Sequence, residues 1–308
     1  MGGSYWSDEF YNSRSAHRAA TGASAFAYDD MLRRGPPHAR KTHRLMDPRH
    51  VRLRESRDSA SHPESRAVAV LFDVTGSMGC IPVILQRKLG RLMALLLSRQ
   101  YLAHPQVLFG AIGDATCDRA PLQVGQFESG LEMEDDLGRM FLEGGGGGQS
   151  TESYELAAYF MARHTALDCL ERRGQKGYLF IIGDEQYYPA VSRRQAYHVI
   201  GDHVQERIST PAIYAELGRM YEVFHLIPRG ASNSGDLRIH EAWRSLLGQN
   251  VLVLDDPAAV CETIALSIGL CEGRVDLAGG LDDLDGLGAD AGARRSVSNA
   301  LATVTHRH

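Results

Sequence analysis

Paired cysteines and long apolar segments are both missing from this sequence of 308 residues. Its five cysteines are scattered and odd in number, and none belongs to a C-x-x-C pair, so we expect neither a disulfide framework nor a cysteine zinc site. No apolar run is long enough to span a membrane, and the first residues have neither the basic region nor the apolar core of a secretory signal. We therefore expect a cytoplasmic protein that does not enter a membrane.

Two common catalytic signatures are missing as well. Five glycines at 144–148 are followed by Gln149 and not by Gly-Lys-Ser/Thr, so a nucleotide phosphate would lack the lysine of a P-loop. Thr75 stands two residues before Ser77, where the G-x-S-x-G elbow of serine hydrolases has glycine. The formal net charge of -5 argues against a general nucleic-acid binder. These absences disfavour P-loop nucleotide hydrolysis, serine hydrolysis and nucleic-acid binding.

The composition divides the chain into three parts. Residues 1–65 lack a sustained apolar period and carry many basic side chains, so we interpret them as a partly disordered, solvated extension with a few short helices. Residues 66–272 are rich in apolar runs and are long enough to form one large domain. Residues 273–308 are rich in glycine, aspartate and alanine, and we expect a disordered acidic tail. The basic side chains of the extension include Arg33, Arg34, Arg40, Lys41, Arg44, Arg49, Arg52, Arg54 and Arg57.

Three apolar runs in the domain, at 67–72, 107–113 and 178–182, have the length of buried strands. Helical patterns separate them, and the clearest is the recurrence of leucine, isoleucine and methionine between 81 and 101. This alternation predicts an α/β fold with a doubly wound, mostly parallel central sheet flanked by helices. An aspartate follows each run, and the carboxyl ends of parallel strands share one edge of the sheet, so the three side chains should converge there. They are Asp73, Asp114 and Asp184.

The remainder of the domain continues the alternation of strands and helices. A half-exposed edge strand is expected at 122–127, where apolar and polar residues alternate. His225 lies inside an apolar run, so we interpret it as a core or edge residue and not as a metal ligand. The other expected elements are helices at 133–142, 191–208, 211–221, 239–247 and 257–270, and strands at 223–227 and 251–254.

The turn after the first strand combines a carboxylate with two hydroxyls. Asp73, Thr75 and Ser77 alternate along the chain and can face one concave spot, because Gly76 and Gly79 allow the backbone to bend between them. One carboxylate and two neutral hydroxyls form a set of hard oxygen donors, which suits Mg²⁺ or Mn²⁺ and not zinc. Alternatively, Asp73 and its neighbours only cap the helix that follows. The local pattern leaves both interpretations open.

A second stretch of interest is the glycine run at 144–148, which precedes a helix that carries Tyr154. Consecutive glycines do not form a stable element, so we expect a mobile loop whose backbone can approach another group closely. Ser150 and Thr151 follow the loop, and a helix N-cap accounts for at least one of these hydroxyls.

Together these residues resemble the von Willebrand factor type A (VWA) domain with its metal-ion-dependent adhesion site (MIDAS). The resemblance covers about residues 66–272 and implies a Rossmann-like fold with Mg²⁺ or Mn²⁺ at the carboxyl edge of the sheet. Asp73, Thr75 and Ser77 match the D-x-S/T-x-S motif of this family. Asp184 matches the later aspartate that usually holds a metal-bound water.

The loop ligand of the family is usually a threonine after the glycines. Thr151 has the matching chemistry and Gln149 the nearest register, so we favour Thr151 and keep Gln149 and Ser150 as alternatives. Asp114 is not one of the usual ligands, and we treat it as an additional ligand or as a group that supports one.

The resemblance implies protein recognition and not catalysis. Hydroxyl ligands carry no charge, so a divalent ion held by them and by Asp73 keeps excess positive charge and an open position for an Asp or Glu carboxylate of a partner protein. Bacterial intracellular members of the family resemble adaptors or assembly factors, often of an ATPase, and this last step is an analogy between folds.

Two alternatives remain at this stage. Asp73-Val74-Thr75-Gly76-Ser77 also resembles the D-x-T-G-T loop of haloacid-dehalogenase-type phosphotransferases, in which the first aspartate is the nucleophile. Gly183-Asp184 would then hold Mg²⁺, but the further aspartate expected a few residues later is missing, and Lys176 is an uncertain phosphate contact. The other alternative is an interaction protein of the same fold without a working metal site, which would use the basic extension and the acidic tail as contacts.

Overall fold

The computed structural model describes residues 4–144, 150–302 and 304, without the side chains of His50 and Ser77. Its centre is a six-stranded sheet in which the strands follow the order β12-β11-β7-β2-β3-β4. All neighbours pair in parallel except β4, which lies antiparallel to β3 at one edge. A mostly parallel α/β sheet is thereby confirmed. The strands are β2 (Arg66–Asp73), β3 (Pro105–Ile112), β4 (Leu122–Val124), β7 (Gly177–Ile182), β11 (Tyr221–Pro228) and β12 (Val251–Leu254).

Strand β2 illustrates why the central strands are apolar throughout. Successive side chains of a strand point to opposite faces of the sheet. Val70 therefore joins the core on one face and Leu71 joins the core on the other, and both are fully buried. A sheet covered on both faces has no solvent side to require polar residues, so its strands appear in sequence as continuous apolar runs.

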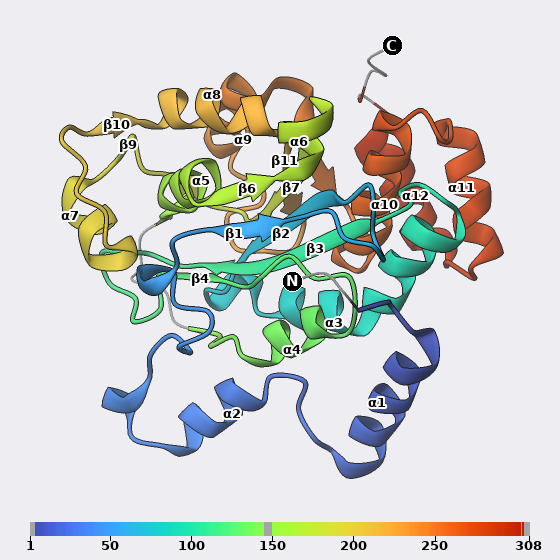
Figure 1. Cartoon of the computed structure of the whole chain (residues 1–308), viewed down its shortest axis with the longest axis horizontal. Helices are drawn as coiled ribbons and strands as arrows, with labels where there is room; N and C mark the ends of the chain where they lie inside the picture. The colour runs from blue at the N-terminus through green and yellow to red at the C-terminus, as the bar shows by residue number, and fades with distance from the viewer. Residues whose placement is uncertain (1–3, 145–149, 303, 305–308) are drawn as a thin grey trace.

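Helices cover both faces of the sheet (Figure 1). Their apolar side chains complete two hydrophobic cores, one on each side. The first layer contains α3 (Cys80–Met93), α4 (Glu132–Gly138), α10 (Val260–Cys271), α11 (Leu277–Gly286) and α12 (Ala291–Leu301). The second contains α5 (Tyr154–Arg163), α6 (Asp168–Arg173), α8 (Thr210–Met220) and α9 (Leu237–Leu247).

Short strands outside the central sheet connect loops to one another. Strands β1 and β6 pair in parallel, as do β5 and β8, whereas β9 and β10 pair antiparallel. Their bounds are β1 (Arg54–Ser56), β5 (Thr151–Glu152), β6 (Thr165–Leu167), β8 (Gln186–Tyr187), β9 (Ala190–Val191) and β10 (Ile208–Ser209).

The segment 191–208 was expected to be one helix, and the structure differs. It contains β9, the single turn α7 (Arg193–Gln195) and a π-helical turn at Ala196–Ile200. Gly201 ends this turn with a φ of 103°, a left-handed conformation that glycine adopts without strain. The chain then leaves the helix and reaches β10.

The N-terminal extension is more ordered than the prediction of a partly disordered, solvated segment. Helices α1 (Asp8–Thr21) and α2 (Ala27–Arg34) lie beside α3 and α4 in Figure 1. Tyr11 is buried, and its hydroxyl donates to the carbonyl of Gln86 on α3 at 2.7 Å. Arg57 pairs with Asp168 at 2.7 Å, so part of the basic arm contacts the domain itself.

The acidic tail was expected to be disordered, and this prediction is wrong for its described residues. Helices α11 and α12 bury Leu281, Leu284, Val297 and Leu301 in the core beside α10. Glycine and aspartate dominate the composition, but a few leucines and valines on one side of each helix are enough to bury apolar surface against a neighbour. No helix within the described ranges combines the length and the apolarity that crossing a membrane requires.

Candidate metal centre

The site lies where the order of strands reverses. From β2 the chain proceeds outward to β3 and β4, and it then returns to β7 on the other side of β2. Open α/β sheets bind ligands at such a point, outside the carboxyl ends of the strands. Asp73 is the last residue of β2, and Asp184 follows the end of β7 by two residues. The two predicted aspartates are therefore adjacent at the switch point.

Only one of the two carboxylate oxygens of Asp73 accepts hydrogen bonds from the described residues. Its Oδ1 accepts hydrogen bonds from the backbone N–H of Thr75 at 2.7 Å and from the Thr75 hydroxyl at 2.6 Å. Both residues are buried. Oδ2 is buried and has no hydrogen-bond partner among the described residues. The hydrogen bonds of the turn therefore use Oδ1, and Oδ2 is available to a ligand.

Asp73 belongs to a buried acidic triad with Asp184 and Glu185, in which one carboxylate oxygen of each lies within 4.8 Å of the others. The backbone N–H of Asn233 donates to Asp184 Oδ2 at 2.6 Å. Glu185 Oε2 has no partner within the described ranges. Sequence reasoning missed Glu185, although its position directly after Asp184 was the available signal.

Two further buried groups border the triad, and neither was predicted. Glu152 on β5 is 3% exposed, and its Oε2 has no partner in the part of the chain that is described. The hydroxyl of Tyr154, at the start of α5, is likewise buried without a described partner. A Cβ built on Gly183 would lie only 1.9 Å from this hydroxyl, so Tyr154 packs directly against the backbone that carries Asp184.

Burial and mutual repulsion determine the protonation of this cluster. Burial, with added repulsion from Asp184, raises the pKa of Asp73 to about 7 despite the opposing hydrogen bonds from Thr75. Burial and the nearby Asp73 raise the pKa of Glu185 to about 8. Burial, followed by Asp73 and Glu185, raises the pKa of Glu152 to about 11. None of the causes named here is a positively charged group. Buried carboxylates need a cation nearby if they are to be ionised.

The donor chemistry fits a hard divalent cation. The triad offers carboxylate oxygens only, and two of those oxygens, Asp73 Oδ2 and Glu185 Oε2, are buried without a described partner. Mg²⁺ and Mn²⁺ prefer such oxygen ligands, whereas zinc sites are usually built with histidine or cysteine. Asp73, Asp184 and Glu185 could therefore hold Mg²⁺ or Mn²⁺.

The two described candidates for the loop ligand, Thr151 and Ser150, differ in their positions relative to this cluster. Thr151 lies on β5 and pairs with Gln186 of β8, two residues beyond Asp184. The interpretation of Ser150 or Thr151 as a helix N-cap is wrong, because α5 begins only at Tyr154 and its N-cap residue is Ser153. Ser150 is exposed.

Some predictions lie outside the described part of the structure. These are Gln149 as a ligand, the mobility of the glycine run at 145–148, and the ligand role of the Ser77 side chain. Gly144 is described, and its N–H donates to the carbonyl of Val74 at 3.2 Å. The first residue of the glycine run therefore contacts the turn that follows Asp73.

Asp114 lies one strand away from the triad, after β3. It is buried, accepts from the Thr116 hydroxyl at 2.7 Å and accepts from the Tyr188 hydroxyl at 3.0 Å. Its charge raises the pKa of Glu185 and of Glu152. The structure does not bring its carboxylate into the triad, so Asp114 acts on the site by its charge.

Comparisons with known proteins give only distant similarities. No family model matches the chain, and no curated protein matches it. Among solved structures, the pilus adhesin SpaC from Lactobacillus rhamnosus GG in its open conformation aligns with a TM-score of 0.45 and 9% identity, over 70% of this chain and 31% of the adhesin. Proximal thread matrix protein 1 from the mussel byssus aligns with a TM-score of 0.41 and 9% identity, over 68% of this chain and 48% of that protein. The chain thus spans less than half of the length of either protein.

Proposed function

We propose that this protein is a VWA-type recognition module that holds Mg²⁺ or Mn²⁺ at the triad and binds an Asp or Glu carboxylate of a partner protein through that ion. The observation that carries the proposal is the buried, unpartnered Oδ2 of Asp73 beside Asp184 and Glu185 at the carboxyl edge of the sheet. A cation is the simplest group that would satisfy these oxygens.

The fold supports the proposal at a coarser level. The sheet is mostly parallel with helices on both faces (Figure 1), and its one antiparallel strand, β4, lies at the edge. The residues that resemble the MIDAS motif follow β2 and β7, the two strands at the switch point. Position in the fold and donor chemistry thus agree with the family that the sequence resembles.

The charge balance favours binding over hydrolysis. Within the proposed ligand set the carboxylates come from the triad alone, and the hydroxyl of Thr75 or Thr151 adds no charge. An ion with few anionic ligands can still accept a carboxylate from outside. By the same analogy between folds, the partner would be a protein complex, for which an ATPase is one candidate.

Phosphoryl transfer by Asp73 is less well supported. Lys176, the lysine considered for that reaction, immediately precedes β7, whereas Asp184 follows its other end. The six residues of β7 separate the two edges of the sheet by about 20 Å. Lys176 instead lies 4.0 Å from Glu222, so it is not placed to contact a phosphate on Asp73.

Calorimetric titration with MgCl₂ and MnCl₂ tests the proposal. Wild-type protein should bind the ion, and Asp73→Asn should bind it at least about tenfold more weakly, because the loss of one charged ligand exceeds about 1.4 kcal/mol. The variant keeps an oxygen that can accept the Thr75 hydrogen bonds, so it should fold normally. The matched control is Glu241→Gln, which removes one charge from an exposed residue of α9. Equal affinity in wild type and Asp73→Asn would exclude the site.

A second experiment separates recognition from phosphoryl transfer. Wild-type protein is incubated with acetyl phosphate and Mg²⁺, and its intact mass is measured. We expect no change in mass. A stable phosphate adduct that disappears in Asp73→Asn would favour the phosphotransferase instead.

A further inference from the structure

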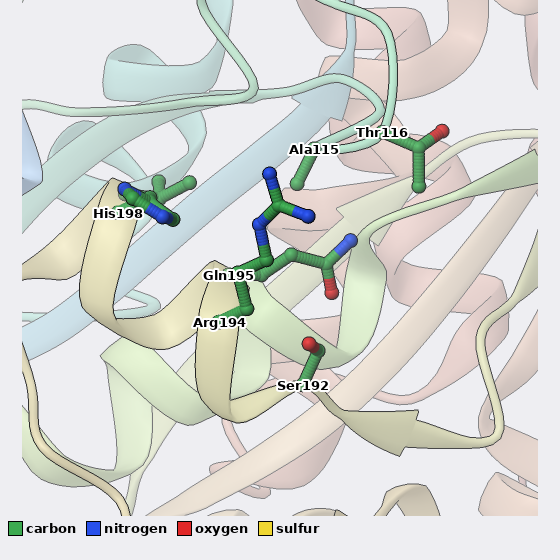
Figure 2. Close-up of a pocket in the computed structure, with 7 residues that line it drawn as sticks. Ala115, Thr116, Ser192, Arg194, Gln195 and His198 are labelled. Atoms are coloured by element: carbon green, nitrogen blue, oxygen red, sulfur yellow. The ribbon is translucent and has the colours of Figure 1, made fainter.

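A cavity of about 480 Å³ opens beside the metal centre, between the loop after β3 and the segment around α7. Figure 2 shows the Arg194 guanidinium extending from α7 toward Ala115. The residues that line the cavity are Ala115, Thr116, Ser192, Arg194, Gln195, His198 and Val199. No aspartate or glutamate is among these described lining residues, so the cavity offers hydrogen-bond donors and positive charge.

The side-chain donors on the α7 side of this cavity have no partner among the described residues. The side chains of Ser192, Arg194, Gln195 and His198 make no hydrogen bond to any residue in the described part of the chain, and Arg194 makes no ion pair there. About half of the other arginines in the described residues have an acidic partner, as Arg163 has in Glu216 at 3.0 Å. An unpaired guanidinium in a concave, acid-free surface is suited to an anionic ligand, and its planar fork matches a carboxylate in particular.

The cavity is connected to the metal centre through one wall. The hydroxyl of Thr116, which lines the cavity, donates to Asp114 at 2.7 Å, and the backbone N–H of Ala115 donates to Ser153 at 2.9 Å. Ser153 follows Glu152, which borders the triad. The loop after β3 is therefore part of the cavity wall and is also held to residues next to the metal centre.

We propose that this cavity is a second anchoring site for the partner protein and that it accepts another acidic side chain of the same segment. The inference rests on the proposed function, because it assumes that a first carboxylate is held at the metal centre. Around that centre the charge of Asp114 adds to that of the triad, and both oppose the approach of an acidic segment. Arg194 supplies the opposite charge beside them, so the preferred partner segment carries two acidic residues, one for each site.

Fluorescence anisotropy with labelled synthetic peptides tests the inference on the full chain. The probes are Gly/Ser peptides with one glutamate, with two glutamates at a short, intermediate or long separation, and with the second glutamate replaced by glutamine. In Mg²⁺, one separation should bind about fivefold more tightly than its glutamine counterpart, the gain expected for one partly exposed ion pair. Arg194→Ala should abolish this gain without weakening the peptide that has one glutamate, and Arg194→Lys should restore part of it.

The matched control is Arg219→Ala, which removes an exposed arginine at the end of α8, just before β11 begins and thus at the opposite edge of the sheet. It should leave all affinities unchanged. A gain that persists in Arg194→Ala, or the absence of a gain at every separation, would overturn the second anchoring site while leaving the metal site intact. Loss of Mg²⁺-dependent binding even for the peptide with one glutamate would contradict the proposed function itself, and the inference would fail with it.

Discussion

The hydroxyl of Tyr154 occupies the space that any side chain at position 183 would need. A Cβ built on Gly183 would lie 1.9 Å from this hydroxyl and 2.8 Å from the ring carbon that bears it. Tyr154 is fully buried, and its ring packs edge-on against Trp243 at 5.2 Å, so it has little freedom to retreat. Position 183 therefore requires glycine, and the close contact fixes the backbone directly before Asp184.

We expect Gly183→Ala to destabilise the protein by about 1–3 kcal/mol, the usual range for an overpacked core. The same variant should weaken Mg²⁺ binding, because the backbone shift displaces Asp184. Urea unfolding and calorimetry measure the two effects. Gly218→Ala is the matched control, since nothing lies within 4 Å of a Cβ at that helical position and alanine there should stabilise α8 slightly. A Gly183→Ala variant as stable as wild type would show that Tyr154 can move.

The stability of the metal-free protein should fall as the pH rises from about 5 to about 8. The pKa values of Asp73 and Glu185 are raised in the folded protein to about 7 and about 8, so the folded state holds protons that the unfolded state has already released. Proton retention stabilises the fold below the ordinary carboxyl pKa, and this stabilisation is lost as the pH rises through the raised values. Thermal unfolding in EDTA across this range measures the effect.

Mg²⁺ should reduce this pH dependence, because the ion replaces the protons and releases them on binding. Calorimetry in two buffers with different heats of ionisation would detect the released protons. Asp73→Asn should flatten the curve in EDTA, whereas Glu241→Gln, on the exposed surface of α9, should not. A melting temperature that rises steadily with pH in EDTA would contradict the expected protonation of the cluster.

His225 contributes in the opposite direction, because it lowers stability in mild acid, and its effect is measured in Mg²⁺, where the pH dependence of the carboxylate cluster is reduced. The ring is fully buried and stacks on Trp243 with centroids 3.6 Å apart, and burial lowers its pKa to about 3. Below the ordinary histidine pKa the unfolded chain binds a proton on this ring and the folded chain does not. His225 therefore lowers the stability of the fold as the pH falls. His225→Phe should shrink the difference in unfolding free energy between pH 7 and pH 5 by about 2 kcal/mol.

The control for this effect is His203→Gln, which changes an exposed histidine and should leave the difference between the two pH values as it is. Urea unfolding at each pH provides the measurement. If His225→Phe and wild type lose the same stability on acidification, another group is responsible for the acid sensitivity.

The C-terminal helices should contribute to the stability of the whole domain. Leu284 on α11 is fully buried in the core beside α10, so Leu284→Ala should cost about 2–5 kcal/mol in the free energy of unfolding. Leu237→Ala is the same change at a residue that is 71% exposed, and it should alter stability by no more than about 0.5 kcal/mol. Similar urea midpoints for the two variants would mean that α11 does not pack on the domain in solution.

Much of the central sheet could be predicted from the sequence. The run at 67–72 became β2 (Arg66–Asp73), and the run at 107–113 became β3 (Pro105–Ile112), because strands buried on both faces admit few polar residues. The position of an aspartate after each parallel strand was sufficient to expect that Asp73 and Asp184 meet at one edge.

Other features depended on packing partners that lie far away in the chain. The tail has the composition of a disordered segment, yet Leu284 and Val297 find an apolar surface beside α10. Glu185 is adjacent to Asp184 in sequence, but whether its side chain faces the cluster or the solvent depends on the path of the chain after β7. Arg194 carries no local motif, and its place beside Thr116 follows only from the folded loops.

The sequence by itself determined the mostly parallel α/β architecture and the acidic residues at the ends of its strands, because strand burial and the alternation of strands with helices are visible in local patterns of apolar and polar residues. The tertiary structure decided which acids share one buried space, which oxygens remain without a partner, and which arginine faces the cavity beside them. Those properties depend on the distances between segments that only the packed core brings together, and no local pattern encodes them.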